Sequence, residues 1–144
     1  MRVWRISSHA DLSGRGGELS TARWNRLGTP IVYCADHPAA ALLEMLVHID
    51  LEDAPAAYQL LGIHVPDGTE IFAPSLPDDW AENLGLTQDI GTRFVSEGRY
   101  AVMAVPSVVA PFTTNYLLSP ALLENTSITI DSRTEHPIDP RLIG

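Results

Sequence analysis

The spacing of apolar residues predicts two helices in this chain. In the first, residues 38–48, nearly every side chain is apolar, and Pro38 is well tolerated in the first turn of a helix. The second, residues 87–98, ends at Gly98, a residue type common just after a helix. Asp89 and Arg93 are placed one turn apart in this second segment, as an ion pair on a helix would be.

Short segments with strand character contain most of the remaining apolar residues, and they are bounded by turn-forming residues. Gly28 lies between the segments 21–24 and 30–34, which are predicted to pair as a hairpin. Many short strands and few helices predict an α+β fold, and a length of 144 residues suits a single domain that spans residues 1–144. The strand-like segments are residues 3–6, 21–24, 30–34, 58–65, 71–74, 100–105 and 127–131.

The first predicted helix contains the stretch AAALLEMLV at 39–47, in which Glu44 is the only polar residue. A helix that is apolar on all sides belongs in a core, where an ionised carboxylate is unfavourable unless a partner or a function holds it. Arg23, in the predicted hairpin, is a candidate partner. Glu44 is therefore either half of a structural ion pair or part of a functional site.

Composition and charge narrow the possible functions. Apolar residues make up 45% of the chain and the formal net charge is −9, which argues against a general nucleic-acid-binding protein. No apolar run is long enough to span a membrane, and the N-terminal residues lack the apolar segment of a signal peptide. A single cysteine, Cys34, and histidines without metal-ligand spacing predict a cytoplasmic protein that holds no metal.

Every positively charged side chain is an arginine, and five of the nine lie in the first 26 residues. The planar, forked guanidinium group suits bidentate binding of phosphate. Arg15 lies in the glycine-rich segment 12–17, whose backbone can approach an anion closely. Solvated surface arginines and a flexible turn are the alternative explanations.

Few polar residues interrupt the predicted apolar segments. Arg23 and Tyr33 lie in the predicted hairpin, Glu44 lies in the helix, and Ser107 follows Pro106 at a break in an apolar run. Each has a structural explanation, namely a surface position, a hydroxyl at the rim of the core, an ion pair or a turn. Together, however, an arginine, a tyrosine and a carboxylate can bind a pyrophosphate, stack on an aromatic ring and hydrogen-bond a ribose, as a site for NAD requires.

The motifs around these residues resemble the RES-domain toxins of bacterial toxin–antitoxin pairs. The family is named for an arginine, a glutamate and a serine, which match Arg23, Glu44 and Ser107. One departure is SPAL at 119–122, where the family usually has an asparagine and a His-Pro pair. The matching motifs are ARWN at 22–25, GTPIVY at 28–33, ALLEMLVH at 41–48, VPS at 105–107 and NYLLSP at 115–120, and the resemblance extends from residue 4 to residue 143.

The resemblance implies a single compact RES domain with a fold similar to the ADP-ribosyltransferase, or diphtheria-toxin-like, core. It implies a toxin that consumes NAD by cleaving the nicotinamide–ribose bond, with water or phosphate as the acceptor. Transfer of ADP-ribose to a host protein is the alternative, and a non-catalytic partner-binding domain is a third interpretation. The expected partner is an antitoxin with an Xre-type helix-turn-helix domain, in a complex that contains a homo-oligomer of the toxin.

Roles for individual residues follow from this resemblance. Glu44 is expected to stabilise positive charge on the ribose during cleavage, because a fixed carboxylate in a dry pocket does so far better than one in water. Arg23 is expected to hold a phosphate or the ribose, and Tyr33 is expected to stack on nicotinamide. Ser107 is expected to hydrogen-bond a ribose or phosphate oxygen. The predicted catalytic and NAD-binding residues are therefore Arg23, Tyr33, Glu44 and Ser107. Arg15 and Asn115 are weaker candidates for contact with NAD.

Overall fold

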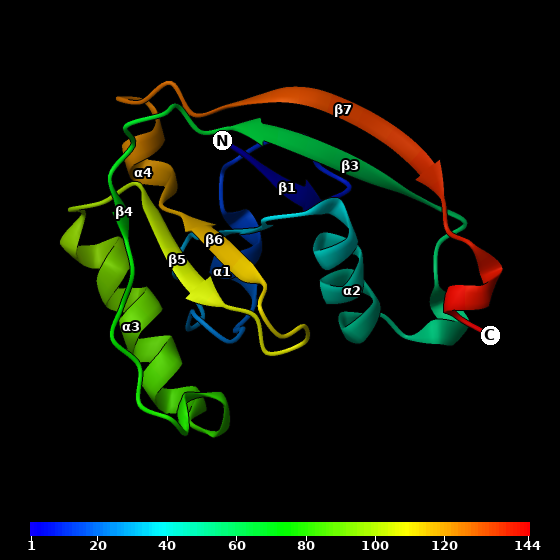
Figure 1. Cartoon of the computed structure of the whole chain (residues 1–144), viewed down its shortest axis with the longest axis horizontal. Coiled ribbons are helices and arrows are strands. Elements are labelled where there is room, and N and C mark those ends of the chain that lie inside the picture. Colours follow the sequence, from blue (N-terminus) through cyan, green and yellow to red (C-terminus); the bar gives the residue numbers. More distant parts are fainter.

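Seven strands form one mostly antiparallel sheet in the computed structural model, which describes residues 1–144 apart from the side chain of Leu51 (Figure 1). The strand order is β4-β5-β6-β2-β1-β3-β7, and β4 and β5 run parallel. The strands are β1 (Arg2–Ile6), β2 (Val32–Ala35), β3 (Ala57–His64), β4 (Ile71–Phe72), β5 (Val102–Pro106), β6 (Thr114–Leu118) and β7 (Thr129–Pro137). The helices are α1 (Arg15–Leu19), α2 (Pro38–His48), α3 (Leu84–Glu97) and α4 (Pro120–Leu123), with 3-10 turns η1 (Leu51–Asp53), η2 (Trp80–Glu82) and η3 (Pro140–Leu142).

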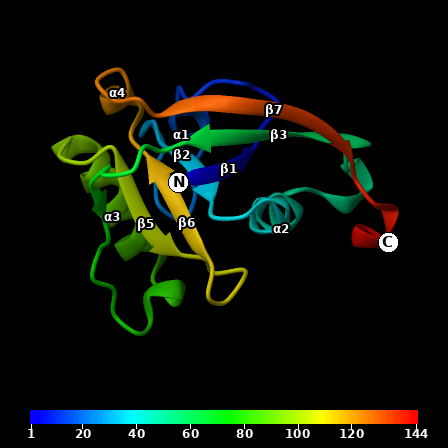
Figure 2. The ribbon, with the colours of Figure 1, turned by 45° about the horizontal axis from the view of Figure 1, so that its top comes forward.

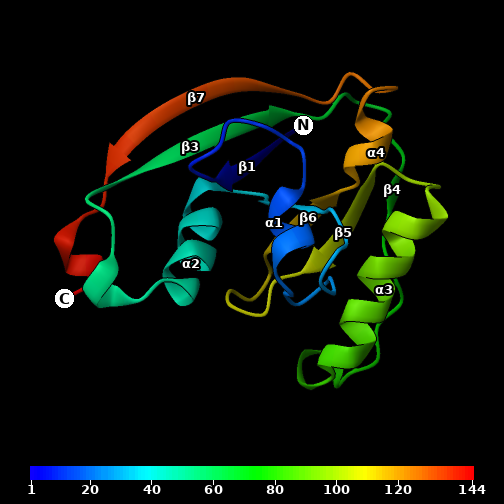
Figure 3. The ribbon, with the colours of Figure 1, turned by 180° about the vertical axis from the view of Figure 1, so that it is seen from behind.

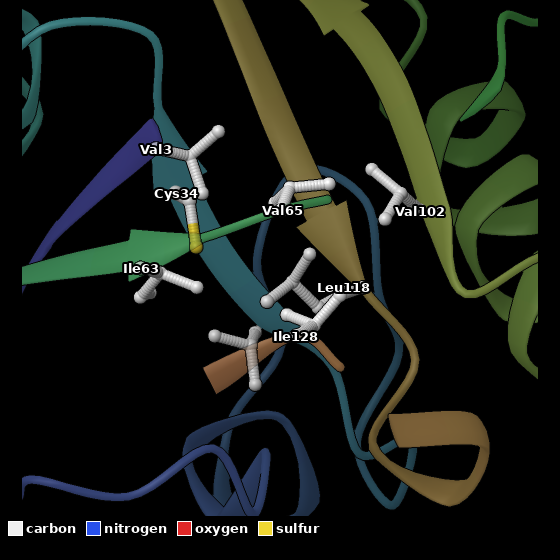
Figure 4. Close-up of a cluster of buried hydrophobic side chains, with 8 residues drawn as sticks. Val3, Cys34, Ile63, Val65, Val102, Leu118 and Ile128 are labelled. Carbon is white, nitrogen blue, oxygen red and sulfur yellow. The ribbon is translucent and has the colours of Figure 1, made fainter. Parts of the chain in front are cut away.

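Buried side chains lie on both faces of the sheet, because successive residues of a strand point to opposite sides. Along β2, Val32 and Cys34 face one side, whereas Tyr33 and Ala35 face the other. Figure 4 shows the cluster on the first side, where strands that are far apart in the sequence meet. Its buried members are Val3, Val32, Cys34, Ile63, Val65, Val102, Leu118 and Ile128.

Two helices cover the second face. Phe94 of α3 packs on Met103 and Leu117, from β5 and β6. Further along the same face, α2 packs on β1 and β2 through a separate small cluster of Ala35, Ala40 and Ala41 with Trp4 and Ile6. Figure 1 shows α2 and α3 standing apart, with the connection between β5 and β6 lying between them.

The first predicted helix is confirmed as α2. His37 is its N-cap residue and accepts a hydrogen bond from the backbone N–H of Ala39 at 3.0 Å, and Pro38 occupies the first turn. The second predicted helix is α3, which begins earlier, at Leu84, and ends at Gly98 in the left-handed conformation with φ of 61°. The predicted α+β class is therefore confirmed.

The predicted hairpin at residues 21–34 is wrong in its first strand. Ala22 and Asn25 instead close a tight turn through their backbone groups. Asn25 is fully buried, and its side-chain amide donates to the carbonyls of Gly17, Ser20 and Arg26. The two amide protons of this one side chain are shared among three loop carbonyls, which stabilises the irregular backbone in place of a strand.

The N-terminal half also contains a short helix, α1, where the sequence predicted a glycine-rich loop (Figure 3). Gly14 begins it with φ of 70°, and a Cβ atom there would lie 2.6 Å from the backbone nitrogen of Ile31. This close approach explains why a glycine is needed at the position.

Strands β3 and β7 extend beyond the rest of the sheet as a two-stranded ribbon that passes α2 (Figure 2). The predicted strand at 127–131 belongs to β7, which is longer than predicted and ends at Pro137. No helix among the described residues is long and apolar enough to cross a membrane.

Candidate functional site

Glu44, on α2, accepts hydrogen bonds from two residues far along the chain. Ser107, at the start of the β5–β6 connection, donates from Oγ to Oε1 at 2.9 Å. Asn115, on β6, donates from Nδ2 to the same oxygen at 3.0 Å. The structure therefore brings together three of the residues that the sequence singled out, and it supplies the partners that the carboxylate required.

Arg23 is not one of these partners, so the ion pair considered from the sequence is wrong. Its Nη1 atom donates to the backbone carbonyl of Ala81 at 3.0 Å, and Thr87 Oγ1 on α3 donates to the carbonyl of Arg23 at 2.6 Å. No cation among the described residues lies within ion-pairing distance of Glu44. The two side chains that bond to the carboxylate, Ser107 and Asn115, are neutral donors.

Tyr33 joins β2 to the turn that carries Arg23. Its hydroxyl donates to Asn25 Oδ1 at 2.6 Å and accepts from the backbone N–H of Trp24 at 3.1 Å. Burial raises the pKa of the Tyr33 phenol well above its ordinary value, and the Trp24 hydrogen bond and the nearby Arg23 charge only partly oppose this shift. Tyr33 is therefore a neutral group near pH 7.

Tyr33 and the Glu44 cluster lie on the same face of the sheet. In the pairing of β2 with β6, Tyr33 lies opposite Leu117 and Ala35 lies opposite Asn115. Tyr33 and Asn115 are therefore diagonal neighbours, a relationship that places residues roughly 7–8 Å apart on one face. The tyrosine ring and the carboxylate cluster are close enough to contact a single ligand the size of a nucleotide.

Arg5, on β1, is a possible site residue that the sequence did not predict. Its Nη1 atom donates to the backbone carbonyl of Tyr33 at 3.0 Å, and its Nε–H is buried without a partner among the described residues. A charged residue in the apolar segment Val3–Ile6 was the available signal. Arg5 lines a cavity of about 200 Å³, together with Gly16, Gly17, Ser20, Ala22, Asn25, Ile31 and Tyr33.

Arg15, which the sequence predicted as a weaker candidate for NAD contact, does not lie at the cavity. It is exposed at the start of α1, and it does not line the cavity, although the adjacent Gly16 and Gly17 do. Within the described structure, the cation that faces the cavity is therefore Arg5. A partly buried guanidinium with an unpaired N–H is suited to bind an anionic group.

A second hollow, of about 460 Å³, lies between α3 and β4 and contains none of the predicted site residues. Phe72 and Tyr100 stack there with ring centroids 5.3 Å apart. In the described part of the chain, no three His, Cys, Asp or Glu side chains converge as metal ligands. The chemistry that the Glu44 site offers is that of a carboxylate, a hydroxyl and an amide, with the Tyr33 phenol on the same face of the sheet.

The model of the RES domain matches residues 2–136 of this sequence. The chain belongs to the RES domain family. The resemblance predicted from the Arg23, Glu44 and Ser107 motifs is therefore confirmed.

Curated RES relatives match this domain over almost their whole length. A protein of Pseudomonas putida named "Toxin Res" is 41% identical over 143 residues, which is 92% of this chain and 99% of the relative. A protein of Sphingobium sp. named "Prs ADP-ribosylating toxin" is 36% identical over 153 residues, 97% of this chain and 95% of the relative.

The fold of this RES domain also matches a solved structure, the M. tuberculosis MbcT–MbcA toxin–antitoxin complex. The TM-score is 0.71 at 20% sequence identity, and the match covers 99% of this chain and 86% of the other. The likeness at this identity concerns the fold, and it confirms the predicted single compact α+β architecture.

Proposed function

We propose that this RES domain, residues 1–144, is the toxin of a toxin–antitoxin pair and that it consumes NAD by cleaving the nicotinamide–ribose bond. The observation that carries the proposal is the state of Glu44. Its carboxylate is held by Ser107 and Asn115, both neutral, and no described cation neutralises it. An anion fixed in this way can stabilise the positive charge that develops on the ribose.

In the proposed reaction, the bond between the ribose C1 atom and the nicotinamide nitrogen breaks. The bonding electrons leave with nicotinamide, whose ring nitrogen loses its positive charge, and the ribose becomes an oxocarbenium-like cation beside Glu44. Water, or phosphate, then adds to the ribose carbon, and the proton of water passes to solvent. Arg23 and Arg5 are the proposed cations for the NAD phosphates, and Tyr33 is the proposed stacking partner of nicotinamide. Metal chemistry has no part in the proposal.

A second candidate is transfer of ADP-ribose to a host protein. The relative from Sphingobium, 36% identical over 97% of this chain, carries the name "Prs ADP-ribosylating toxin", which supports this alternative. Both reactions break the same bond and use the same pocket, and they differ in the group that accepts the ribose. The acceptor therefore has to be identified by product analysis.

A partner is part of the proposal, because free toxin would deplete NAD in the cytoplasm of its own cell. The solved structure with the same fold was determined as a toxin–antitoxin complex, which supports a protein inhibitor for this chain. We propose an Xre-type antitoxin bound to an oligomer of this domain. The purified complex is expected to turn over NAD only after the antitoxin is removed, and full activity of the intact complex would refute inhibition.

The test of the activity uses antitoxin-free protein and NAD labelled in its adenylate half. Free nicotinamide together with labelled ADP-ribose, or its phosphate ester, supports NAD cleavage. Label on a protein band supports transfer. A folded preparation that consumes no NAD, in the presence or absence of cell extract, would refute both reactions and leave a non-catalytic partner-binding domain. In cells, expression without antitoxin should stop growth and lower the NAD concentration.

A further inference from the structure

The two donors to Glu44 meet only one of its carboxylate oxygens. Ser107 Oγ and Asn115 Nδ2 both donate to Oε1, at 2.9 Å and 3.0 Å. Oε2 accepts no hydrogen bond from the described residues, and it is not one of the buried polar atoms without a partner. Oε2 is therefore reachable from outside the protein, whereas Oε1 is occupied. The carboxylate presents one oxygen to a ligand and uses the other as an anchor.

The hydroxyl group of Ser107 has no capacity left for a ligand. A serine hydroxyl has one proton to donate and two lone pairs that accept. Its oxygen accepts from the backbone N–H groups of Val109 and Ala110, both at 3.1 Å, and its proton points to Glu44. A substrate could bond to Ser107 only by displacing one of these three contacts.

Asn115 is different, because half of its side chain is unused. A carboxylate can only accept, so the amide nitrogen of Asn115 must face Glu44, and this fixes the orientation of the amide. Its Oδ1 atom is buried and has no partner among the described residues. A buried acceptor without a partner is unfavourable in the free protein. A ligand that displaces the groups covering Oδ1 and supplies an N–H or O–H group relieves this penalty.

We propose that Ser107 and Asn115 divide the work at this site. Ser107 is a positioning residue, which acts only by fixing Glu44 and the loop that follows β5. Asn115 is a ligand-contacting residue, whose Oδ1 accepts from a ribose hydroxyl or from the carboxamide of nicotinamide while Glu44 Oε2 faces the ribose. This inference rests on the proposed NAD cleavage and changes the role that the sequence assigned to Ser107.

The test measures kcat and KM for NAD cleavage in Ser107→Ala and Asn115→Ala. Ser107→Ala is expected to lower kcat by about 10-fold or more and to leave KM within about twofold, because an interaction that acts only on the transition state changes kcat alone. Asn115→Ala is expected to lower kcat and also to raise KM by about 3- to 10-fold, the effect of losing one neutral hydrogen bond. Ser96→Ala and Asn125→Ala, at exposed positions on α3 and after α4, are the matched controls.

Two further variants separate a positioning role from a merely structural one. Ser107→Thr keeps the hydroxyl and should restore kcat to within a few-fold of wild type, whereas Ser107→Ala should not. In a Glu44→Gln background, Ser107→Ala should cause little additional loss, since residues that act through one group are not additive. Melting temperatures of all variants exclude unfolding as the cause.

A KM for Ser107→Ala that rises as much as that for Asn115→Ala would overturn the division of roles. So would a full additional loss from Ser107→Ala in the Glu44→Gln background, or an Asn115→Ala variant with unchanged KM. These three results count against the division of roles only if the wild-type protein cleaves NAD in the same assay. Failure of the wild-type protein to bind or cleave NAD would instead refute the proposed function, and the division of roles with it.

Discussion

The hydroxyl of Tyr33 donates a hydrogen bond to Oδ1 of Asn25 at 2.6 Å, and this contact fastens β2 to the turn that carries Arg23. Asn25 is fully buried, so water cannot replace the lost donor. Tyr33→Phe is expected to lower the free energy of unfolding by about 1–3 kcal/mol, because it leaves a buried acceptor unpaired. Urea unfolding measures the change. Tyr58→Phe, in which the hydroxyl makes no bond to the described residues, should have little effect.

Arg23→Lys keeps the charge but loses the forked geometry. If Arg23 holds a phosphate or the ribose through two bonds, the variant should remain folded and lose at least about 10-fold in kcat/KM, since one hydrogen bond to a charged group is worth about 1.5–3 kcal/mol. Arg133→Lys, at an exposed position on β7, is the control. Wild-type turnover by the Arg23 variant would mean that no bidentate contact there matters.

Glu44→Gln tests whether the carboxylate serves chemistry or stability. A glutamine oxygen can still accept from Ser107 and Asn115, so its amide nitrogen would take the place of Oε2 and replace the anion with a donor. We expect a melting temperature within a few degrees of wild type and a loss of NAD cleavage of at least about 100-fold. Glu124→Gln, on the surface after α4, is the matched control. A collapsed melting temperature would indicate a structural role.

Gly91 of α3 lies against the backbone of Trp24, where a Cβ atom would come within 1.6 Å of the carbonyl oxygen. Gly91→Ala must push α3 away from the turn that carries Arg23, and overpacking of this kind costs about 1–3 kcal/mol or more. The melting temperature should fall by about 3–10 °C. Gly85→Ala, in the first turn of the same helix, meets nothing closer than 3.9 Å and should leave the melting temperature unchanged or raise it.

Cys34 makes stability depend on pH in the alkaline range. Burial raises the pKa of its thiol from 9.0 to about 12. Below pH 9 the folded and unfolded states both hold this proton, whereas between pH 9 and about 12 only the folded state retains it, so folding becomes less favourable as the pH rises. The free energy of unfolding should fall by up to about 1.4 kcal/mol per pH unit from this group.

Urea unfolding of wild type and Cys34→Ala at several pH values tests this linkage. The variant should lose stability less steeply above about pH 9, because the Cys34 thiol no longer releases a proton when the protein unfolds. Some slope should remain, since burial also raises the pKa of Tyr33. Equal slopes in the two proteins would show that Cys34 does not titrate differently in the folded and unfolded states.

Local sequence signals predicted the elements whose stability is mainly local. The α2 helix has its cap residue, its proline and its apolar stretch in one continuous segment, so its bounds follow from the sequence. The strand at 21–24 failed because Asn25 bonds to carbonyls of Gly17 and Ser20, which a local pattern does not reveal. The α1 helix was missed because two of its five residues are glycine, which disfavours a helix.

The residues of the candidate site were largely named from the sequence, but their contacts were not. Glu44 lies 63 residues from Ser107 and 71 residues from Asn115, and the pairing of β6 with both β2 and β5 brings them together. The same spacing problem led to the wrong pairing of Glu44 with Arg23. Similarly, Asp89 pairs with Arg26, across 63 residues, and not with Arg93 one turn away.

The sheet has a narrow neck. β1 and β2 pair through one register position, Trp4 with Ala35. This pair joins one half of the sheet, strands β4-β5-β6-β2, to the other half, strands β1-β3-β7. The α2 helix, which carries Glu44, packs across this junction on both β1 and β2. The two donors to the carboxylate belong to the half of the sheet that contains β5 and β6. A bend between β1 and β2 would move α2 relative to β6 and lengthen both hydrogen bonds to Glu44, so the position of the carboxylate depends on how firmly the two halves of the sheet are joined.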